Sequence, residues 1–313
     1  MRHLVTKELV PRAIRGLESA ERYAALHLIS PCQSTEKNQD RLATARNGAT
    51  LFATVCDGAT QSLMSEAAAE VLTDDPVALW NDGVLTERIR LLERRRDELV
   101  SKAAGEVVDQ TSFLSRSMAD IVRKKRRQAY QSTFVSVRVT VRPSSVFLEA
   151  RLCGDSALLV FDELGRLLYS NLRVHDAASS FNHISPYTDV LPDHYQGEAL
   201  SCALEIGADS HVVLCSDGFY DAFPNAGALF RWLLLNGARM AAAGDELHKG
   251  LQGSRGDDDI SAVWLYRCTQ EIASRDTAAL APQALKPSTV AARCWQQVRR
   301  LFRVGGLFAG GQS

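Results

Sequence analysis

Residues 51–58 read LFATVCDG, and residues 211–218 read HVVLCSDG. Each stretch contains a short apolar run that predicts a buried β-strand, and each ends in an aspartate followed by a glycine. An Asp-Gly pair after a strand is a common turn, and for either pair alone we favour that interpretation. Together, the two stretches place Asp57 and Asp217 at equivalent positions, at the ends of two buried strands.

Two further aspartates lie beside apolar runs. Asp155 shortly precedes the run at 157–161, and Asp258 precedes the run at 260–266. Carboxylates gathered at the ends of buried strands repel one another and lose hydration, so a fold with four of them calls for cations. Oxygen ligands without clustered His or Cys suit Mg²⁺ or Mn²⁺ better than zinc. The sequence therefore predicts a site for hard divalent cations.

The composition is typical of a folded globular protein. The chain has 313 residues, of which 46% are hydrophobic and 23% are charged, and its net charge is -1. These values exclude intrinsic disorder, collagen and small disulfide scaffolds. The balanced charge gives no overall attraction to nucleic acid. The length allows one large domain or two modest ones.

The cysteines and the N-terminus indicate a cellular compartment. There are seven cysteines and no CxxC pair, so a structural zinc site is not expected. Cys56, Cys153 and Cys215 lie in or next to apolar runs, and none begins a C-x5-R phosphate loop, so we interpret them as packing residues. The N-terminus lacks the apolar core of a signal peptide, and no apolar run reaches the roughly 18 residues of a membrane span. We predict a cytoplasmic protein.

The rest of the chain alternates helical and strand-like patterns. A helix is predicted at about 65–72, and a stripe of Leu and Ile predicts a long amphipathic helix around 85–99. The other predicted elements are a helix at about 102–128, strands at 133–141 and 146–153, a loop-like surface flap at about 170–196 and a helix at about 226–235. After Cys268 the composition shifts to Ala, Gly, Ser and Pro, and we place a domain boundary there.

Several short motifs follow one another in a fixed order. They are EKNQDR at 36–41, VCDGAT at 55–60, STF at 132–134 with CGDS at 153–156, LCSDGFYD at 214–221 and GDDDIS at 256–261. In this order they resemble the metal-dependent type-2C protein Ser/Thr phosphatases of the bacterial type, over residues 30–267. The resemblance implies an α+β fold, a four-layer α/β/β/α sandwich in which two antiparallel sheets are flanked by helix pairs. Residues 1–29 would be a helical lead-in, and residues 268–313 a basic tail with a short amphipathic helix.

The resemblance also implies roles for individual residues. Two Mn²⁺ or Mg²⁺ ions would activate a water molecule that attacks the phosphorus of a phosphoprotein, such as a Ser/Thr kinase or its target. The implied metal ligands are Asp40, Asp57, the carbonyl of Gly58, Asp155, Asp217 and Asp258. Asp57 would bridge the two ions, and Asp155 matches the position of a third, weaker ion in some members. Asp57 and Asp217 are the implied catalytic residues.

Three positions depart from the family pattern. Thr35 replaces the arginine that binds the substrate phosphate, so Lys37 or Arg41 would have to take its place. Gln39 replaces a common carboxylate, and Ala59 a histidine that acts as general acid in some members. These departures motivate a second hypothesis, a catalytically silent module that binds a phosphoprotein or a regulatory partner. The retained first-ion carboxylates argue against it. Hydrolysis of a small phosphorylated metabolite is a third hypothesis.

Other features have both a structural and a functional interpretation. His175, His183 and His194 lie in the flap, where one could act as a general acid, but solvated loop histidines are the favoured interpretation. The basic run at 123–127 favours a solvated helix end over contact with nucleic acid or an acidic partner. Residues 295–308 predict an amphipathic helix, for which docking on protein is favoured over contact with a membrane.

Overall fold

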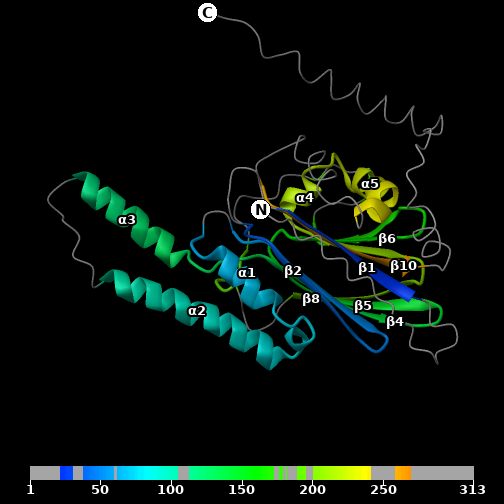
Figure 1. The fold of residues 1–313 in the computed structure, drawn as a ribbon, viewed down its shortest axis with the longest axis horizontal. Helices are drawn as coiled ribbons and strands as arrows, with labels where there is room; N and C mark the ends of the chain where they lie inside the picture. Colours follow the sequence, from blue (N-terminus) through cyan, green and yellow to red (C-terminus); the bar gives the residue numbers. More distant parts are fainter. Residues whose placement is uncertain are drawn as a thin grey trace, which may run out of the picture. The chain divides into compact units, whose positions relative to one another are not determined.

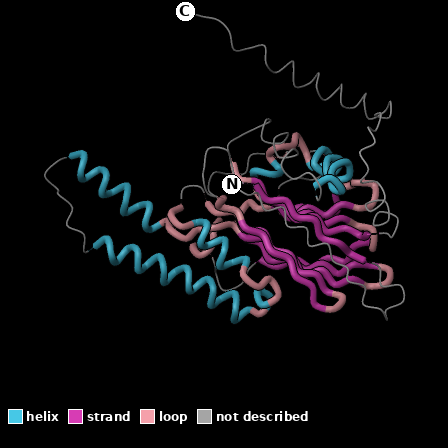
Figure 2. The backbone as a smooth tube through the Cα atoms, in the orientation of Figure 1, coloured by secondary structure: helices cyan, strands magenta, loops and turns pink. Residues whose placement is uncertain are grey.

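The computed structural model describes residues 22–30, 38–59, 62–104, 113–172, 176–178, 181, 189–194, 200–240 and 258–268. These residues form two antiparallel five-stranded sheets that stack face to face (Figures 1 and 2). In spatial order, the first sheet consists of β1 (Arg22–Ser30), β10 (Ile260–Cys268), β9 (His211–Cys215), β6 (Ala157–Phe161) and β7 (Leu167–Ser170). The second sheet consists of β2 (Arg41–Asn47), β3 (Thr50–Cys56), β4 (Phe134–Val141), β5 (Ser145–Cys153) and β8 (Leu200–Gly207).

The core between the sheets is built from alternating apolar side chains. Val135, Val137 and Val139 of β4 are fully buried in one cluster with Val212 and Leu214 of β9. Val213 and Cys215, which alternate with them along β9, are buried too, in a second cluster on the outer side of the sheet. Strands that are buried on both faces give the near-continuous apolar runs seen in the sequence.

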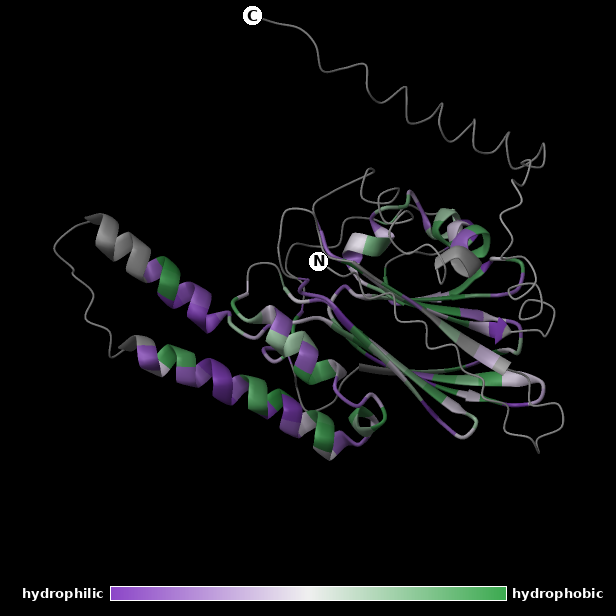
Figure 3. Cartoon of the chain, in the orientation of Figure 1, coloured by the Kyte–Doolittle hydropathy of each residue, from purple (hydrophilic) through white to green (hydrophobic). Residues whose placement is uncertain are grey.

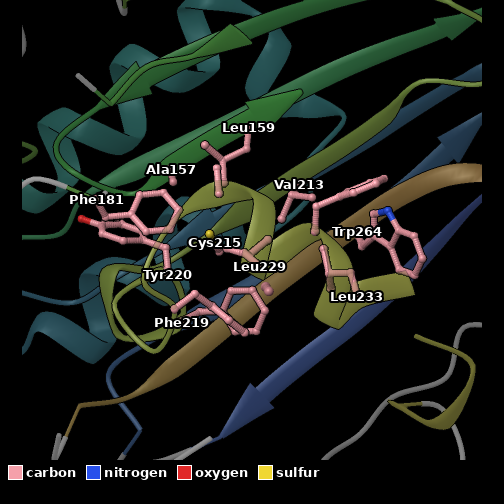
Figure 4. Close-up of a cluster of buried hydrophobic side chains, with 14 of the residues drawn as sticks. Ala157, Leu159, Phe181, Val213, Cys215, Phe219, Tyr220, Leu229, Leu233 and Trp264 are labelled. Carbon is pink, nitrogen blue, oxygen red and sulfur yellow. The ribbon is translucent and has the colours of Figure 1, made fainter. Parts of the chain in front are cut away.

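Helices cover the outer face of each sheet (Figure 1). Outside the second sheet lie α1 (Ser65–Thr73), the short 3-10 helix η1 (Ala78–Trp80), α2 (Asp82–Ala104) and α3 (Phe113–Arg127). Outside the first sheet lie α4 (Asp217–Tyr220) and α5 (Ala226–Met240). Figure 4 shows Leu229 and Leu233 of α5 packed with Val213 and Cys215 of β9. The arrangement confirms the predicted α+β sandwich of four layers.

The predicted amphipathic helix is α2. Leu85, Ile89 and Leu92 are buried in the cluster that α1 and α2 form over the second sheet, and Leu99 packs against the same cluster. The apolar stripe therefore faces α1 and the sheet, as its spacing predicts. α3 packs alongside α2, and the two helices extend beyond the edge of the sheets (Figure 1).

The prediction of a helical lead-in over residues 1–29 is wrong for its last eight residues. Residues 22–30 form β1, which pairs with β10 along its whole length. Tyr23 and Leu28 are buried, one between the sheets and one under α4 and α5. The pairing with β10 therefore decides the conformation of this segment. The first 21 residues lie outside the described residues.

Three more strands were not expected from the sequence. They are β2, β7 and β8, each at or next to an edge of its sheet. The predicted flap at 170–196 is described only in part, and that part is not simply a surface loop. Phe181, Val190 and Leu191 are buried, so the described pieces pack on the sandwich.

The predicted C-terminal tail and its amphipathic helix lie outside the described residues, which end at Cys268. None of the helices in the described part of the chain is both long and apolar enough to cross a membrane.

Candidate metal centre

The predicted aspartates meet at one edge of the sandwich because strand pairing groups them within each sheet and the two sheets stack on each other. The first residue of β2, Arg41, pairs with the last residue of β3, Cys56. Asp40, which precedes Arg41, and Asp57, which follows Cys56, therefore lie side by side. The last residue of β9 pairs with the start of β6 on one side and with β10 on the other. This pairing brings Asp155 and Asp258 next to Asp217. The structure thus gathers all five predicted carboxylates.

Burial and nearby negative charge raise the pKa of four of these carboxyl groups, those of Asp40, Asp57, Asp217 and Asp258. Loss of hydration raises the pKa of Asp57 well above its usual value, and the nearby charges of Asp40 and Asp217 raise it further. Burial raises the pKa of Asp217 to about 6, and the nearby charges of Asp258 and Asp155 act in the same direction. Burial also raises the pKa of Asp258, which lies on the exposed rim of the cluster. The cluster is therefore unfavourable at neutral pH unless positive charge enters it.

Asp40 shows this cost most clearly. Its side chain is fully buried, and neither carboxylate oxygen has a hydrogen-bond partner. Burial raises the pKa of Asp40 to about 7, although the nearby hydroxyls of Ser261 and Ser216 lower it in part. A buried carboxylate without a partner is rare in folded proteins, because its lost hydration is not replaced. The two oxygens are therefore suited to bind a cation.

Two glycines let the loops of the cluster approach each other. A Cβ atom on Gly218 would lie 2.1 Å from the carbonyl oxygen of Asp259, and one on Gly58 would lie 2.8 Å from the carbonyl oxygen of Gln39. Both distances are shorter than real Cβ contacts, so a side chain at either position would push the loops apart. The glycine that follows Asp57 or Asp217 is thus required by close packing, which positions the neighbouring aspartates.

Hydroxyl groups fix the main chain of Asp57. Its amide donates to Thr133 Oγ1 at 3.2 Å, and its carbonyl accepts from Ser132 Oγ at 2.8 Å and from the Thr133 amide at 2.8 Å. Thr133 Oγ1 also lies 2.5 Å from Ser156 Oγ, beside Asp155. The residues between β5 and β6 are thereby tied to the end of β3. Sequence reasoning gave these hydroxyls no role, although Ser132 and Thr133 lie in the STF motif.

Asp259 fixes the main chain of the residue before Asp40. One of its carboxylate oxygens accepts the amide of Gln39 at 2.6 Å, and the Asp40 amide donates to Asn38 Oδ1 at 2.8 Å. The short segment before β2 is therefore held by the segment before β10.

The oxygen donors of this cluster fit a hard divalent cation. The unpartnered oxygens of Asp40 and the buried, mutually repelling carboxylates of Asp57 and Asp217 both favour positive charge at this place. Among the described residues, no three His, Cys, Asp or Glu side chains already form a closed ligand set. The groups that could hold ions are Asp40, Asp57, the carbonyl of Gly58, Asp155, Asp217 and Asp258.

The predicted phosphate-binding side chains are not both in view. Lys37 lies outside the described residues. The Arg41 guanidinium donates to Glu66 at 2.5 Å and to the carbonyls of Asn38 and Asp40 at 2.7 Å each. Its charge is therefore already paired, and its donors brace the segment before β2.

The histidines and cysteines follow their structural interpretation where they are described. His194 accepts the Val190 amide at 3.0 Å and lies 3.6 Å from Asp189, so it closes a turn of its own segment. The other two flap histidines lie outside the described residues. Cys56 and Cys215 are buried, and burial raises the pKa of both thiols well above the usual value. Neither is a thiolate nucleophile at neutral pH.

The chain matches several solved structures at low identity. One is a bacterial serine phosphatase, with 15% identity, a TM-score of 0.46, and coverage of 79% of this chain and 98% of that chain. Stp1 from Staphylococcus aureus has 15% identity, a TM-score of 0.43 and coverage of 82% and 99%. PppA, a key regulatory component of T6SS in Pseudomonas aeruginosa, has 17% identity and a TM-score of 0.46. The match covers 79% of this chain and 98% of that chain.

A search of curated proteins finds no match. The model of the family described as Protein phosphatase 2C matches residues 30–253. This match spans more than half of the chain and includes β2 to β9 with the aspartates that follow β3 and β9. The chain belongs to the protein phosphatase 2C family.

Proposed function

We propose that this protein is a metal-dependent phosphoprotein phosphatase that hydrolyses phosphoserine and phosphothreonine with two Mn²⁺ or Mg²⁺ ions. The observation that carries the proposal is the cluster of strand-end aspartates in which both oxygens of buried Asp40 lack a partner. A family of phosphatases supplies the reaction class, and the cluster supplies the means.

Bound divalent cations would supply an activated water molecule and would offset the charge that builds up on the phosphoryl oxygens. The chain itself contributes a fixed set of oxygen atoms. Hydrogen bonds from Thr133 and Ser132 hold the main chain of Asp57, so its carboxylate has little freedom to move away. Asp217 Oδ1 accepts the Gly218 amide at 2.6 Å, which orients the second carboxylate. A preorganised ligand set lowers the cost of binding each ion.

The substrate phosphate would meet few positive side chains among the described residues. The Arg41 guanidinium is already paired with Glu66, and Ala59 offers no proton donor. We therefore propose that the ions carry most of the phosphate's charge compensation and that Lys37 or Arg41 adds affinity only. Protonation of the leaving group then falls to water. This assignment favours substrates whose alcohol leaves with modest help, and it predicts a slow enzyme with a strict need for metal.

The test is hydrolysis of p-nitrophenyl phosphate and of a phosphothreonine peptide by the full chain. Mn²⁺ should support turnover of both, and EDTA or the Asp217→Asn substitution should abolish it. An Asp97→Asn variant, which makes the same chemical change on the exposed face of α2, should keep full turnover. Turnover that persists in EDTA or in the Asp217→Asn protein would contradict the proposal.

The same experiment separates the two other hypotheses. A silent binding module, suggested by Gln39 and Ala59, would bind Mn²⁺ in calorimetry and yet release no phosphate above the Asp217→Asn background. A metabolite phosphatase would release phosphate faster from sugar phosphates than from phosphopeptides at equal concentration. We propose the phosphoprotein substrate because the matched family acts on proteins.

A further inference from the structure

The loop that follows the metal centre is fixed to the segment that follows α3. The Ala59 amide donates to the Gln131 carbonyl at 3.2 Å, and the Gln131 amide donates to Ser62 Oγ at 2.9 Å. The Tyr130 amide donates to the Leu63 carbonyl at 2.8 Å. Hydrogen bonds therefore join the loop after Asp57 to the short segment that follows α3.

Two residues of these joined segments have left-handed backbone conformations. Met64 has a φ of 62° and Tyr130 a φ of 60°, left-handed values that cost a non-glycine residue about 1 kcal/mol or more each. The side chain of Tyr130 is buried, whereas Met64 is 53% exposed and its neighbour Leu63 is 41% exposed. A strained turn that holds two large apolar side chains in water beside a candidate active site is a feature of binding surfaces.

The end of α3 nearest to this turn is strongly basic. Of the five consecutive basic residues there, Arg123 pairs with Asp120. Lys124 and Arg127 are exposed, and neither forms an ion pair with any residue that the structure describes. One or two cations would be enough to balance the negative end of the helix dipole. Figure 3 shows the hydrophilic character of this end of α3.

The basic end of α3 is within reach of a peptide bound at the metal centre. Arg127 lies four positions before Gln131, Asp57 lies two positions before Ala59, and one hydrogen bond joins the two segments. At 3.6 Å per residue and about 5 Å across the bonded pair, the path is at most about 27 Å. An extended peptide covers that length in about eight residues. A side chain of the substrate near the phosphorylated residue can therefore meet this surface.

We propose that Lys124 and Arg127, together with Leu63 and Met64, form a docking surface for an acidic stretch of the phosphoprotein substrate. The acidic residues lie within about eight positions of the phosphorylated residue. This inference rests on the proposed phosphatase function and names its substrate class. Charge complementarity identifies the occupant, and the exposed apolar pair suits an apolar residue within the same stretch. A nucleic acid is the less suitable occupant, because no exposed aromatic ring lies on the described part of this surface.

The test compares two phosphothreonine peptides that differ only in their flanks, one with Asp and Glu and one with Gln and Ser. The measured quantity is the ratio of kcat/KM for the acidic peptide to kcat/KM for the neutral peptide, with Mn²⁺ present. In the Lys124→Glu, Arg127→Glu double variant we expect this ratio to fall about tenfold, mainly through KM. Raising the salt to 0.5 M should reduce the ratio for the unmodified protein as well, because exposed charges are screened.

The matched control is Lys102→Glu. Lys102 is an exposed lysine in the last turn of α2. Reversing its charge makes the same kind of change away from the metal centre. The ratio should stay the same in this variant. An equal fall in the control, or an unchanged ratio in the double variant, would overturn the docking surface.

Failure of the phosphatase function would look different. In that case the unmodified protein would release no phosphate from either peptide or from p-nitrophenyl phosphate. Fluorescence anisotropy with a labelled acidic phosphopeptide would then still decide the docking proposal, since the double variant should weaken binding about tenfold and Lys102→Glu should not. Tighter binding of a single-stranded oligonucleotide than of the acidic phosphopeptide would contradict the proposal.

Discussion

Replacing Asp40 with Asn should stabilise the metal-free protein at pH 8 and weaken its hold on metal. Asn has nearly the same shape as Asp and carries no charge. Burial raises the pKa of Asp40 from 3.8 to about 7, so the folded protein pays to ionise this group at pH 8. A shift of about three units corresponds to about 4 kcal/mol of unfolding free energy.

The sign of this effect depends on pH. Because the folded-state pKa is raised, the folded protein keeps a proton that the unfolded chain releases as the pH rises through about 4. Unfolding free energy is therefore lost between pH 4 and pH 7, and the loss is complete above pH 7. The Asn amide also needs partners in a buried site, which costs about 1 to 3 kcal/mol at every pH. We expect a net gain of about 1 to 3 kcal/mol for Asp40→Asn at pH 8 and a net loss at pH 4.

The assay is urea unfolding in EDTA at pH 4, 6 and 8, followed by circular dichroism. Asp97→Asn on α2 is the control, because that carboxylate is exposed and its removal should change little at any pH. A second series with saturating Mn²⁺ should stabilise the unmodified protein more than Asp40→Asn. If the Asp40→Asn difference were the same at pH 4 and pH 8, or if the variant were the less stable protein at pH 8, the account of Asp40 as an uncompensated buried charge would be refuted.

Three further predictions concern the frame of the centre. Gly218→Ala should lower Mn²⁺ affinity by at least tenfold without changing the far-ultraviolet circular dichroism, because its Cβ would lie 2.1 Å from the Asp259 carbonyl oxygen. Gly207→Ala is the control. Its Cβ would lie 3.6 Å from the nearest atom, so neither the affinity nor the spectrum should change. Thr133→Val should cost about 1 to 3 kcal/mol of unfolding free energy, measured by urea, because the Asp57 amide loses its acceptor; an unchanged midpoint would show that the hydroxyl is dispensable. Iodoacetamide should leave phosphate release unchanged in the native protein, because the described cysteines have no thiolate role, and rapid inactivation would contradict that assignment.

Two kinds of strand were predictable from the sequence. β6 and β9 are buried on both faces and have near-continuous apolar runs, which have few interpretations other than a central strand. β4 reads FVSVRVTV, in which apolar residues alternate with polar ones, and β5 buries every second residue. β2 has neither pattern, since it reads RLATARN and is half-buried at an edge, so its conformation depends on partners that a single-sequence pattern does not report.

β8 is a different case, because its signal was present. Its sequence LSCALEIG alternates Leu200, Cys202, Leu204 and Ile206 with small or polar residues, a period of two that predicts a half-buried strand. A strand of this kind packs one face on the core and leaves the other toward solvent. The alternation of apolar with small or polar residues is therefore enough to predict this strand from the sequence.

The candidate site was predictable in its carboxylates and unpredictable in its supports. An aspartate at the end of an apolar strand is visible in one sequence, and the stacking of the two sheets then brings Asp57 and Asp217 together. The contact from Asp259 to the Gln39 amide joins residues 220 positions apart, and no local pattern reports it. The same holds for the close approach at Gly218, which in sequence is only part of an Asp-Gly turn.

The most direct test of the metal centre is calorimetric titration of the full chain with Mn²⁺ at pH 6, in two buffers of different ionisation enthalpy. Because the pKa values of Asp40 and Asp217 are raised to about 7 and about 6, the metal-free protein holds protons that Mn²⁺ must displace. We predict binding with release of about one to two protons per chain, and loss of most of that binding in Asp57→Asn. Heat that does not depend on the buffer, or Mn²⁺ binding that survives Asp57→Asn unchanged, would contradict the assignment of this cluster as the metal centre.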